Sequence, residues 1–223
     1  MRMKQKKLLF FTIFILLLHS SAQSQQQNEY VDKIIKEVQE KYVPDRRVAI
    51  FDISYKIENE TLFLKGETNM QESLDEVLDK LKGTGFQIEN EVELLPSEEL
   101  KENLYAIVNI SVCNMRSDKR HPAELSTQSL LGTPLRVYKR DGSWFYVQTP
   151  DDYLGWVDAG GISLKNEKEL NKWMTTDKVI YTYDFGFAYS EPDVKSRRVS
   201  DVAAGNILML LEDKEIFFKV LFP

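Results

Sequence analysis

Residues 132–150 read GTPLRVYKRDGSWFYVQTP, and residues 205–223 read GNILMLLEDKEIFFKVLFP. Placed over each other without a gap, the two segments align glycine with glycine, aliphatic with aliphatic, aromatic with aromatic and proline with proline. The matched pairs are Gly132 with Gly205, Leu135 with Leu208, Val137 with Leu210, Trp144 with Phe217, Phe145 with Phe218, Val147 with Val220 and Pro150 with Pro223. Because Gly205 follows Gly132 by 73 positions, the second half of the chain contains an internal repeat with that offset.

Short apolar runs separated by turn residues make up this half, which is typical of an all-β structure. An offset of 73 residues is long for a solenoid and suits a pair of small barrels. The segment Glu167–Met174 between the two copies has a helical pattern. We therefore expect two β modules connected by a short helix.

The first copy, at residues 104–164, contains several motifs in a characteristic order. They are Asn114-Met115-Arg116, Glu124-Leu125-Ser126-Thr127-Gln128, Leu131-Gly132, Trp144-Phe145-Tyr146-Val147 and Tyr153-Leu154-Gly155-Trp156-Val157. These motifs resemble those of bacterial SH3 domains, a resemblance that implies a small β-barrel. Gly132 and Gly155 would permit tight backbone at the barrel corners.

The second copy, at residues 177–223, is more divergent. It keeps Ser200-Asp201-Val202 and the segment Phe217–Val220, but Phe187-Ala188-Tyr189 stands where the first copy has Asn-x-Arg. The resemblance nevertheless implies a second bacterial SH3 domain, so the expected arrangement is a tandem pair.

The first copy continues past Pro150 with Asp151–Val157, which would form its closing strand, whereas the second copy stops at the aligned Pro223. A barrel without its last strand has an open edge, which proteins normally cover. We therefore expect the second barrel to be incomplete, and the chain to be the front part of a longer protein or a shortened relative of one.

The segment 28–96 has a mixed pattern that predicts an α+β domain. Apolar residues recur at helical spacing in Val31, Ile34, Ile35 and Val38 and in Leu74, Val77, Leu78 and Leu81, and they alternate with polar residues in Phe51–Ile57, Thr61–Lys65 and Phe86–Val92. Asn69 and Glu72 are spaced as in a capping box. The order α-β-β-α-β and the segments Leu64–Thr68, Leu74–Leu81 and Val92–Pro96 resemble the BON-like fold of bacterial envelope proteins. The polar segment 97–103 is expected to be a linker.

The first 22 residues are typical of a secretory signal peptide. Arg2, Lys4, Lys6 and Lys7 precede the apolar run Leu8–Leu18, and small residues follow at Ser20 and Ala22. The alternative is a membrane anchor, but the run is shorter than the roughly 20 residues that span a bilayer. No cysteine follows the run, so we expect no lipid attachment there. The expected location is periplasmic or secreted, with no stable membrane span after cleavage.

Composition excludes several classes of function. The formal net charge of -6 argues against nucleic acid as a partner, because such binding depends on clustered basic residues. Cys113 is the single cysteine, so an intramolecular disulfide is impossible. Neither metal-ligand spacing nor a phosphate-binding loop is present, so no metal and no cofactor are expected.

A cysteine peptidase needs a thiolate, a histidine that activates it and a third group that orients the histidine. Cys113 lies in an apolar strand pattern and is interpreted as a buried core thiol, while His121 precedes Pro122 and is expected in a loop. We therefore expect no catalytic residue in these 223 residues. Whether the whole protein is an enzyme stays open.

A signal peptide, a BON-like unit and two bacterial SH3 modules together resemble the N-terminal region of secreted NlpC/P60-family cysteine peptidases, which cut peptidoglycan. The resemblance implies a noncatalytic region that binds or targets cell-wall peptide, with stem peptides and a C-terminal peptidase domain absent from this chain as partners. The alternative is a shortened stand-alone envelope protein whose SH3 modules contact proteins or peptidoglycan.

The resemblance also implies two substrate-binding residues. Glu124 opens the Glu-Leu-x-x-Gln segment and Tyr153 directly precedes Leu-Gly-Trp, and in such relatives these positions help to hold the free amine of the terminal L-alanine. The alternative is that Glu124 is a solvated loop carboxylate and Tyr153 a barrel residue. Tyr138, Trp144 and Trp156 could extend an aromatic face, although we expect Trp144 and Trp156 in the barrel core.

Overall fold

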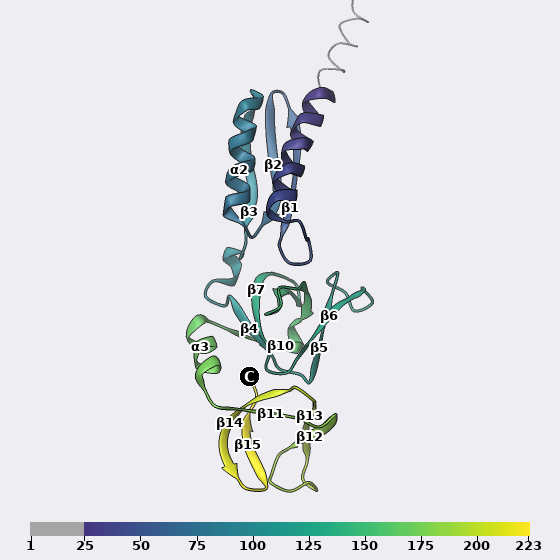
Figure 1. Cartoon of the computed structure of the whole chain (residues 1–223), viewed down its shortest axis with the longest axis vertical. Coiled ribbons are helices and arrows are strands. Elements are labelled where there is room, and N and C mark those ends of the chain that lie inside the picture. Colours follow the sequence, from purple (N-terminus) through teal and green to yellow (C-terminus); the bar gives the residue numbers. More distant parts are fainter. Residues whose placement is uncertain (1–24) are drawn as a thin grey trace, which may run out of the picture. The chain divides into compact units, whose positions relative to one another are not determined.

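The computed structural model describes residues 25–223 (Figure 1). The predicted signal peptide, residues 1–22, lies outside the described residues. The described chain divides into two compact units, one of residues 25–44 and 51–93 and the other of residues 45–50 and 94–223. Strands dominate the second unit, and helices are concentrated in the first.

The first unit follows the predicted order of elements. A helix over residues 25–42 is followed by β1 (Phe51–Glu58), β2 (Thr61–Thr68), α2 (Gln71–Leu81), a 3-10 turn (Lys82–Thr84) and β3 (Gln87–Leu94). The strands form one sheet in the order β1-β2-β3, and β1 pairs antiparallel with β2. The fully buried apolar side chains come from both helices and from one face of β2: Val31, Val38, Leu62, Leu64, Val77 and Leu81. The core of this unit therefore lies between the helices and the sheet.

The predicted capping box at Asn69 and Glu72 is wrong. The N-cap of α2 is Met70, and its side chain makes no capping hydrogen bond. Instead the Met70 amide donates to Thr68 Oγ1 at 3.2 Å, and the Ser73 hydroxyl donates to the Met70 carbonyl at 2.7 Å. The N-cap is therefore Met70 and not Asn69, so the residue three positions after the N-cap is Ser73 and not Glu72. The pair of residues that a capping box requires is absent.

The second unit begins with a seven-stranded antiparallel sheet, in the order β10-β4-β7-β8-β9-β5-β6. Its strands are β4 (Tyr105–Val108), β5 (Val112–Arg116), β6 (Leu125–Leu130), β7 (Pro134–Asp141), β8 (Trp144–Gln148), β9 (Leu154–Asp158) and β10 (Ile162–Lys165). We call this sheet, with its loops, the first module. It encloses a core in which Val108, Met115, Val137, Val147 and Val157 have no exposed surface. A 3-10 turn (Glu98–Leu100) lies within the predicted linker before it, and another (Ala159–Gly161) precedes β10.

Helix α3 (Glu167–Thr175) leads from the first module to five further strands. They are β11 (Lys178–Ile180), β12 (Phe185–Tyr189), β13 (Arg198–Ala203), β14 (Ile207–Lys214) and β15 (Phe217–Leu221), which we call the second module (Figure 1). Each begins 73 residues after its counterpart among β4 to β8. The offset predicted from sequence is therefore present in the strands.

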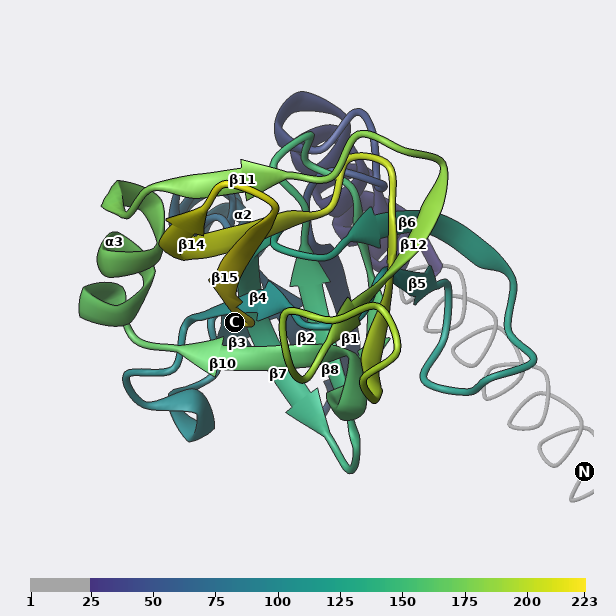
Figure 2. The ribbon, with the colours of Figure 1, turned by 90° about the horizontal axis from the view of Figure 1, so that it is seen from below.

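The two modules differ in how their strands connect. In the first module β9 pairs with β8 on one side and with β5 on the other, so all strands belong to one sheet. Among the described residues, the second module has no counterpart of β9. Its strands form two separate sheets, β11-β14-β15 and β12-β13 (Figure 2).

The two modules share apolar clusters. Leu131 packs with Val202 and Leu208, and Ile107 packs with Met209 and Trp173 of α3. The connection is also polar, because the Ile207 amide donates to the Leu131 carbonyl at 2.9 Å. The Asn206 side chain donates to the Ser111 carbonyl at 2.9 Å. The second module is therefore built directly onto the first.

Candidate functional site

The outer face of β7, β8 and β9 carries aromatic and cationic side chains. Tyr146 and Trp156 are cross-strand partners whose ring centroids lie 5.0 Å apart. The Lys139 ammonium lies 5.5 Å from the Tyr146 centroid and 5.3 Å from that of Trp156, and Lys119 approaches Trp156 at 5.8 Å. These distances are within the range of cation–π attraction.

The prediction that Trp156 belongs to the barrel core is wrong. Trp156 is only partly buried, whereas its neighbours Gly155 and Val157 are buried. Successive residues of a strand point to opposite faces, so Val157 fills the core and Trp156 lies on the outside. Apolar character alone could not distinguish these positions.

Trp144 is buried, with 9% of its surface exposed, and its ring lies 5.1 Å from that of His121. His121 belongs to the loop 117–124, as predicted, which packs against the outer face of β8. The loop is held by hydrogen bonds from the Ser117 amide to the Glu124 carbonyl (2.9 Å) and from Arg116 to the Ala123 carbonyl (2.8 Å). An ion pair between Lys119 and Asp141 adds a further tie.

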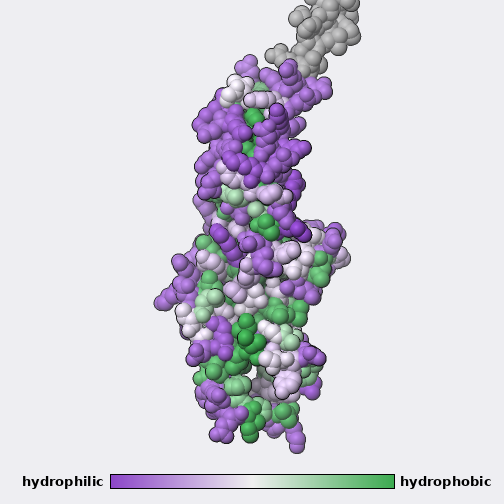
Figure 3. All heavy atoms as spheres, in the orientation of Figure 1, coloured by the Kyte–Doolittle hydropathy of each residue, from purple (hydrophilic) through white to green (hydrophobic). Residues whose placement is uncertain are grey.

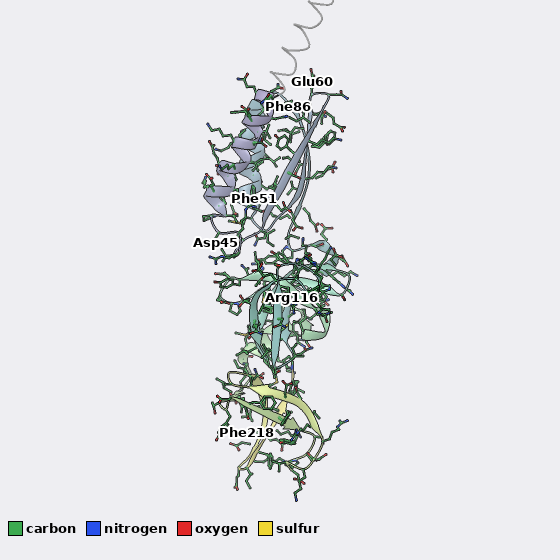
Figure 4. All side chains as sticks on the ribbon, turned by 90° about the vertical axis from the view of Figure 1, so that its right-hand side faces the viewer. Asp45, Phe51, Glu60, Phe86, Arg116 and Phe218 are labelled. Atoms are coloured by element: carbon green, nitrogen blue, oxygen red, sulfur yellow. The ribbon has the colours of Figure 1, made fainter. Side chains whose placement is uncertain are left out.

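Glu124 and Tyr153 lie at the same end of the sheet. Glu124 directly precedes β6 and Tyr153 directly precedes β9, and both strands run antiparallel to β5, which lies between them. Arg116, at the end of β5, is labelled in Figure 4 and is paired with both Leu125 and Trp156. The Glu124 side chain is exposed, and Tyr153 is half-buried. The fold thus brings the two predicted residues to one rim of the first module.

The Tyr153 ring already faces a cation from a distant part of the sequence. The Arg47 guanidinium carbon lies 5.9 Å from the ring centroid, and the Arg47 carbonyl accepts a hydrogen bond from the Leu154 amide at 2.8 Å. The guanidinium is held by Asp45, with Nη2 2.7 Å from Oδ2. Hydrogen bonds from Arg47 lower the pKa of Asp45 to about 2, so this pair stays charged above that pH.

The segment 45–50 therefore contributes to this rim. Gln148 donates to the Val48 carbonyl at 2.7 Å, and Ile50 packs with Leu95, Tyr138 and Leu154. Sequence reasoning missed Arg47, because a contact between residue 47 and residue 153 leaves no periodic signal. It also missed Lys119 and Lys139, although the alternation of β7 places Lys139 on the outer face once the bulge after Val137 is allowed for.

Cys113 is a core residue, as predicted. It is 3% exposed within the cluster that includes Met115 and Phe145, and burial, with a smaller contribution from the charge of Asp158, raises its pKa to about 11. His121 is exposed and contacts the outer face of β8, whereas Phe145 beside Cys113 belongs to the inner face. The thiol and the imidazole therefore lie on opposite faces of one strand. This arrangement cannot form a nucleophile–base pair.

Residues 25–223 contain no cluster of three or more His, Cys, Asp or Glu side chains placed to bind a metal ion. No helix in the same range is long and apolar enough to cross a membrane.

Residues 115–162 match the family model of the bacterial dipeptidyl-peptidase SH3 domain. The matched range runs from β5 to the start of β10, so a bacterial SH3 domain lies within the first module. No curated protein sequence matches the chain.

Two solved structures that match part of the chain are NlpC/P60 proteins. One, an NlpC/P60 family protein from Bacillus cereus, is 22% identical with a TM-score of 0.43, and the match covers 53% of this chain and 51% of that one. The other, an NlpC/P60 endopeptidase from Photobacterium damselae subsp. piscicida, is 17% identical with a TM-score of 0.41, covering 57% of this chain and 33% of that one. The chain therefore spans about half the length of the first and a third of the second.

Proposed function

We propose that this chain is a noncatalytic, cell-wall-associated binding region whose first module recognises peptidoglycan stem peptides. The observation that carries the proposal is the match of residues 115–162 to the SH3 domain of bacterial dipeptidyl-peptidases. The position of Glu124 and Tyr153 on one rim supports it. The burial and raised pKa of Cys113 argue that the described residues supply binding and not a thiolate nucleophile.

The ligand group at this rim is the free amine of the terminal L-alanine. The exposed carboxylate of Glu124 would pair with the ammonium, and the Tyr153 ring would provide an aromatic wall. Arg47 already occupies one side of that ring, so an incoming amine shares the ring with the guanidinium or displaces it. An exposed ion pair contributes about 0–1 kcal/mol, so we expect binding by this chain alone to be weak. A C-terminal peptidase domain, the second proposed partner, would supply the remaining walls of the pocket.

The test is an NMR titration with L-Ala-γ-D-Glu-diamino acid peptide. We expect the amide signals of residues around 124 and 153 to shift first, and an N-acetylated peptide to give smaller shifts. Glu124→Gln should weaken binding, while Glu99→Gln, a change at another exposed glutamate, should not. Arg47→Ala should strengthen binding by freeing the Tyr153 ring. Equal responses to the free and acetylated peptides would contradict recognition of the amine.

The alternative function is that of a stand-alone envelope protein that contacts other proteins through its SH3 modules. The outward-facing aromatic pair Tyr146 and Trp156 favours it, because tyrosine and tryptophan are enriched in protein interfaces. Trp156→Ala separates the two proposals. It should abolish protein binding in the alternative and leave the response at residues 124 and 153 largely intact in the first.

The cellular location and the remaining domain assignments belong to the same proposal. We place the protein in the periplasm or outside the cell after cleavage near Ala22, and assign the first unit to the BON-like fold and the second module to a divergent SH3 domain. Mass spectrometry of the exported protein should show a chain that begins between residues 21 and 26. An intact Met1 on membrane-bound protein would exclude the cleavage.

A further inference from the structure

Arg116 occupies the middle strand of the rim to which we assign the stem peptide. It ends β5, which lies between β6 and β9, and it pairs with Leu125, the residue after Glu124, and with Trp156. Cross-strand partners point to the same face of a sheet, so the Arg116 side chain leaves the barrel on the outer face, as Trp156 does. A cation therefore lies between the strands that begin directly after Glu124 and Tyr153.

A hydrogen bond directs the Arg116 guanidinium towards Glu124. Nη1 of Arg116 donates to the Ala123 carbonyl oxygen at 2.8 Å, and Ala123 directly precedes Glu124. The Ser117 amide, one residue after Arg116, donates to the Glu124 carbonyl at 2.9 Å and closes the same turn. A guanidinium has five N–H groups, so the bond to Ala123 leaves further donors for a ligand.

Arg116 differs in its charge balance from the other arginines of the rim and its loop. Arg47 is exposed and pairs with Asp45, and Arg120 is exposed and pairs with Asp118. Arg116 is half-buried, and no carboxylate in the described part of the chain forms an ion pair with it. Partial burial of a charge is unfavourable unless an opposite charge replaces the lost water. The Arg116 guanidinium therefore favours an anion supplied by a ligand.

Glu124 has the same property with the opposite sign. Its carboxylate is exposed and forms no ion pair with a described residue, Arg116 included. Two opposite charges that lie on one rim without neutralising each other match a ligand that carries both charges. The visible face of the first module shows hydrophilic and hydrophobic side chains side by side, a mixture that suits a short peptide (Figure 3).

We propose that Arg116 binds the α-carboxylate of the D-glutamate residue of the stem peptide. The inference rests on the proposed function, in which Glu124 and Tyr153 hold the amine of the preceding L-alanine. A γ-linked peptide continues through the side-chain carboxyl group of glutamate, so the α-carboxylate is free and charged. It is attached to the Cα that follows the one carrying the ammonium group, and consecutive Cα atoms are about 3.8 Å apart. Two neighbouring charges of the ligand thus meet two opposite charges of the rim.

The geometry of arginine makes this contact selective. A planar guanidinium donates two parallel N–H bonds to one carboxylate, which an ammonium group cannot do. The bond to Ala123 fixes the guanidinium before the ligand arrives, so less side-chain freedom is lost on binding. Arg116 is therefore a specificity-determining residue. It favours D-glutamate over D-isoglutamine, whose α-carboxyl group is an uncharged amide.

The test compares two peptides that differ in this one group, L-Ala-γ-D-Glu-diamino acid and the same peptide with the α-carboxyl group amidated. NMR titration of the unaltered protein should show binding of the free acid that is about three- to tenfold tighter. Arg116→Gln should bind both peptides equally. Arg116→Lys should keep part of the preference, because it keeps the charge and loses the planar fork.

The matched control is Arg120→Gln, which removes a positive charge from the same loop. Arg120 is already paired with Asp118, so this variant should keep the full preference for the free acid. A purely structural role of Arg116 predicts another result. Loss of the bond to Ala123 would then weaken the binding of both peptides by the same factor and leave the preference unchanged. That outcome would overturn the proposal.

The two peptides also test the proposal on the unaltered protein, where the folding of a variant plays no part. Equal binding of the acid and the amide would reject the role of Arg116. N-acetylation of the L-alanine tests the separate recognition of the amine by Glu124. A response to acetylation without a response to amidation would leave the stem-peptide proposal in place and reject this inference, whereas no binding of any of the three peptides would reject both.

Discussion

Phe145 and Phe218 are phenylalanines at equivalent positions of the two repeat copies. Phe145 is buried, whereas Phe218 is mostly exposed. The strands that carry them, β8 and β15, have equal lengths and identical offsets from their neighbours. The difference arises from β9, which lies beside β8 and has no described counterpart beside β15. A repeated pattern therefore determines which strands form, while burial depends on the next strand in the sheet.

The largest expected contrast comes from truncating these two phenylalanines. Phe145→Ala should cost about 3–5 kcal/mol of unfolding free energy, because it opens a cavity in a closed core. Phe218→Ala should cost below about 1 kcal/mol, because most of its ring is already in water. Urea denaturation of both variants provides the comparison. Equal losses would mean that the Phe218 ring is covered in solution.

The next contrast concerns two glycines of the first module, both with positive φ. Gly132 has φ +88 and a Cβ there would lie 2.4 Å from the Ile207 carbonyl oxygen, whereas Gly142 has φ +59 and open space around it. Gly142→Ala should cost about 1–2 kcal/mol from backbone strain alone. Gly132→Ala should cost about 3 kcal/mol or more, because it also separates the modules. Thermal melting of both variants checks this, and similar losses would contradict the tight approach.

A smaller loss of unfolding free energy is expected on substitution of Asn206, a residue whose equivalent in the first copy is Thr133. Asn206 is fully buried, donates to the Ser111 carbonyl and accepts from the Ala203 amide at 2.9 Å. Asn206→Ala should cost about 2 kcal/mol, since it removes both hydrogen bonds that this buried side chain makes to the backbone. Thr133, its partly buried counterpart, is the control, and Thr133→Ala should cost below about 1 kcal/mol. Melting curves in which the two variants coincide would argue against a polar tie between the modules.

The smallest change in the free energy of unfolding at neutral pH is expected for Cys113→Ala. Burial raises the pKa of the Cys113 thiol from 9.0 to about 11, so the unfolded chain loses the thiol proton first as pH rises. The thiol contributes no pH dependence below about pH 9, and stability falls between pH 9 and 11. Cys113→Ala should remove that part of the alkaline loss. Alkylation at pH 8 should be slow in the folded protein and fast in urea, and rapid labelling of the folded chain would contradict a closed first module.

Local patterns predicted most of the elements in this chain. The helix of residues 25–42, α2, α3 and the strands lie where periodicity and the 73-residue offset place them. Three features were not predicted, and of these only the packing of the segment 45–50 depends on contacts between residues far apart in the sequence. The hydrogen bonds of Thr68 and Ser73 place the N-cap of α2 at Met70, so Asn69 and Glu72 form no capping box. The alternation of side chains along β9 directs Trp156 to the outer face. The segment 45–50 packs on strands about 100 residues away in the sequence.

The candidate site was only partly predictable for the same reason. Glu124 and Tyr153 reach one rim because β6 and β9 flank β5, an arrangement that follows from the barrel topology that the resemblance implies. Arg47 comes from another part of the chain, and no short-range pattern connects it with Tyr153. The positive charge beside the Tyr153 ring therefore could not be predicted from the sequence.

The packing of Leu131 and Ile107 into clusters of the second module has a consequence for biosynthesis. A ribosome releases both residues well before Leu208 and Met209, their partners. During that interval the completed first module carries apolar surface that only later residues can cover. The first module of the nascent chain therefore forms before β14 is available to cover Leu131 and Ile107. A stall in translation between these points would expose an apolar surface that chaperones recognise.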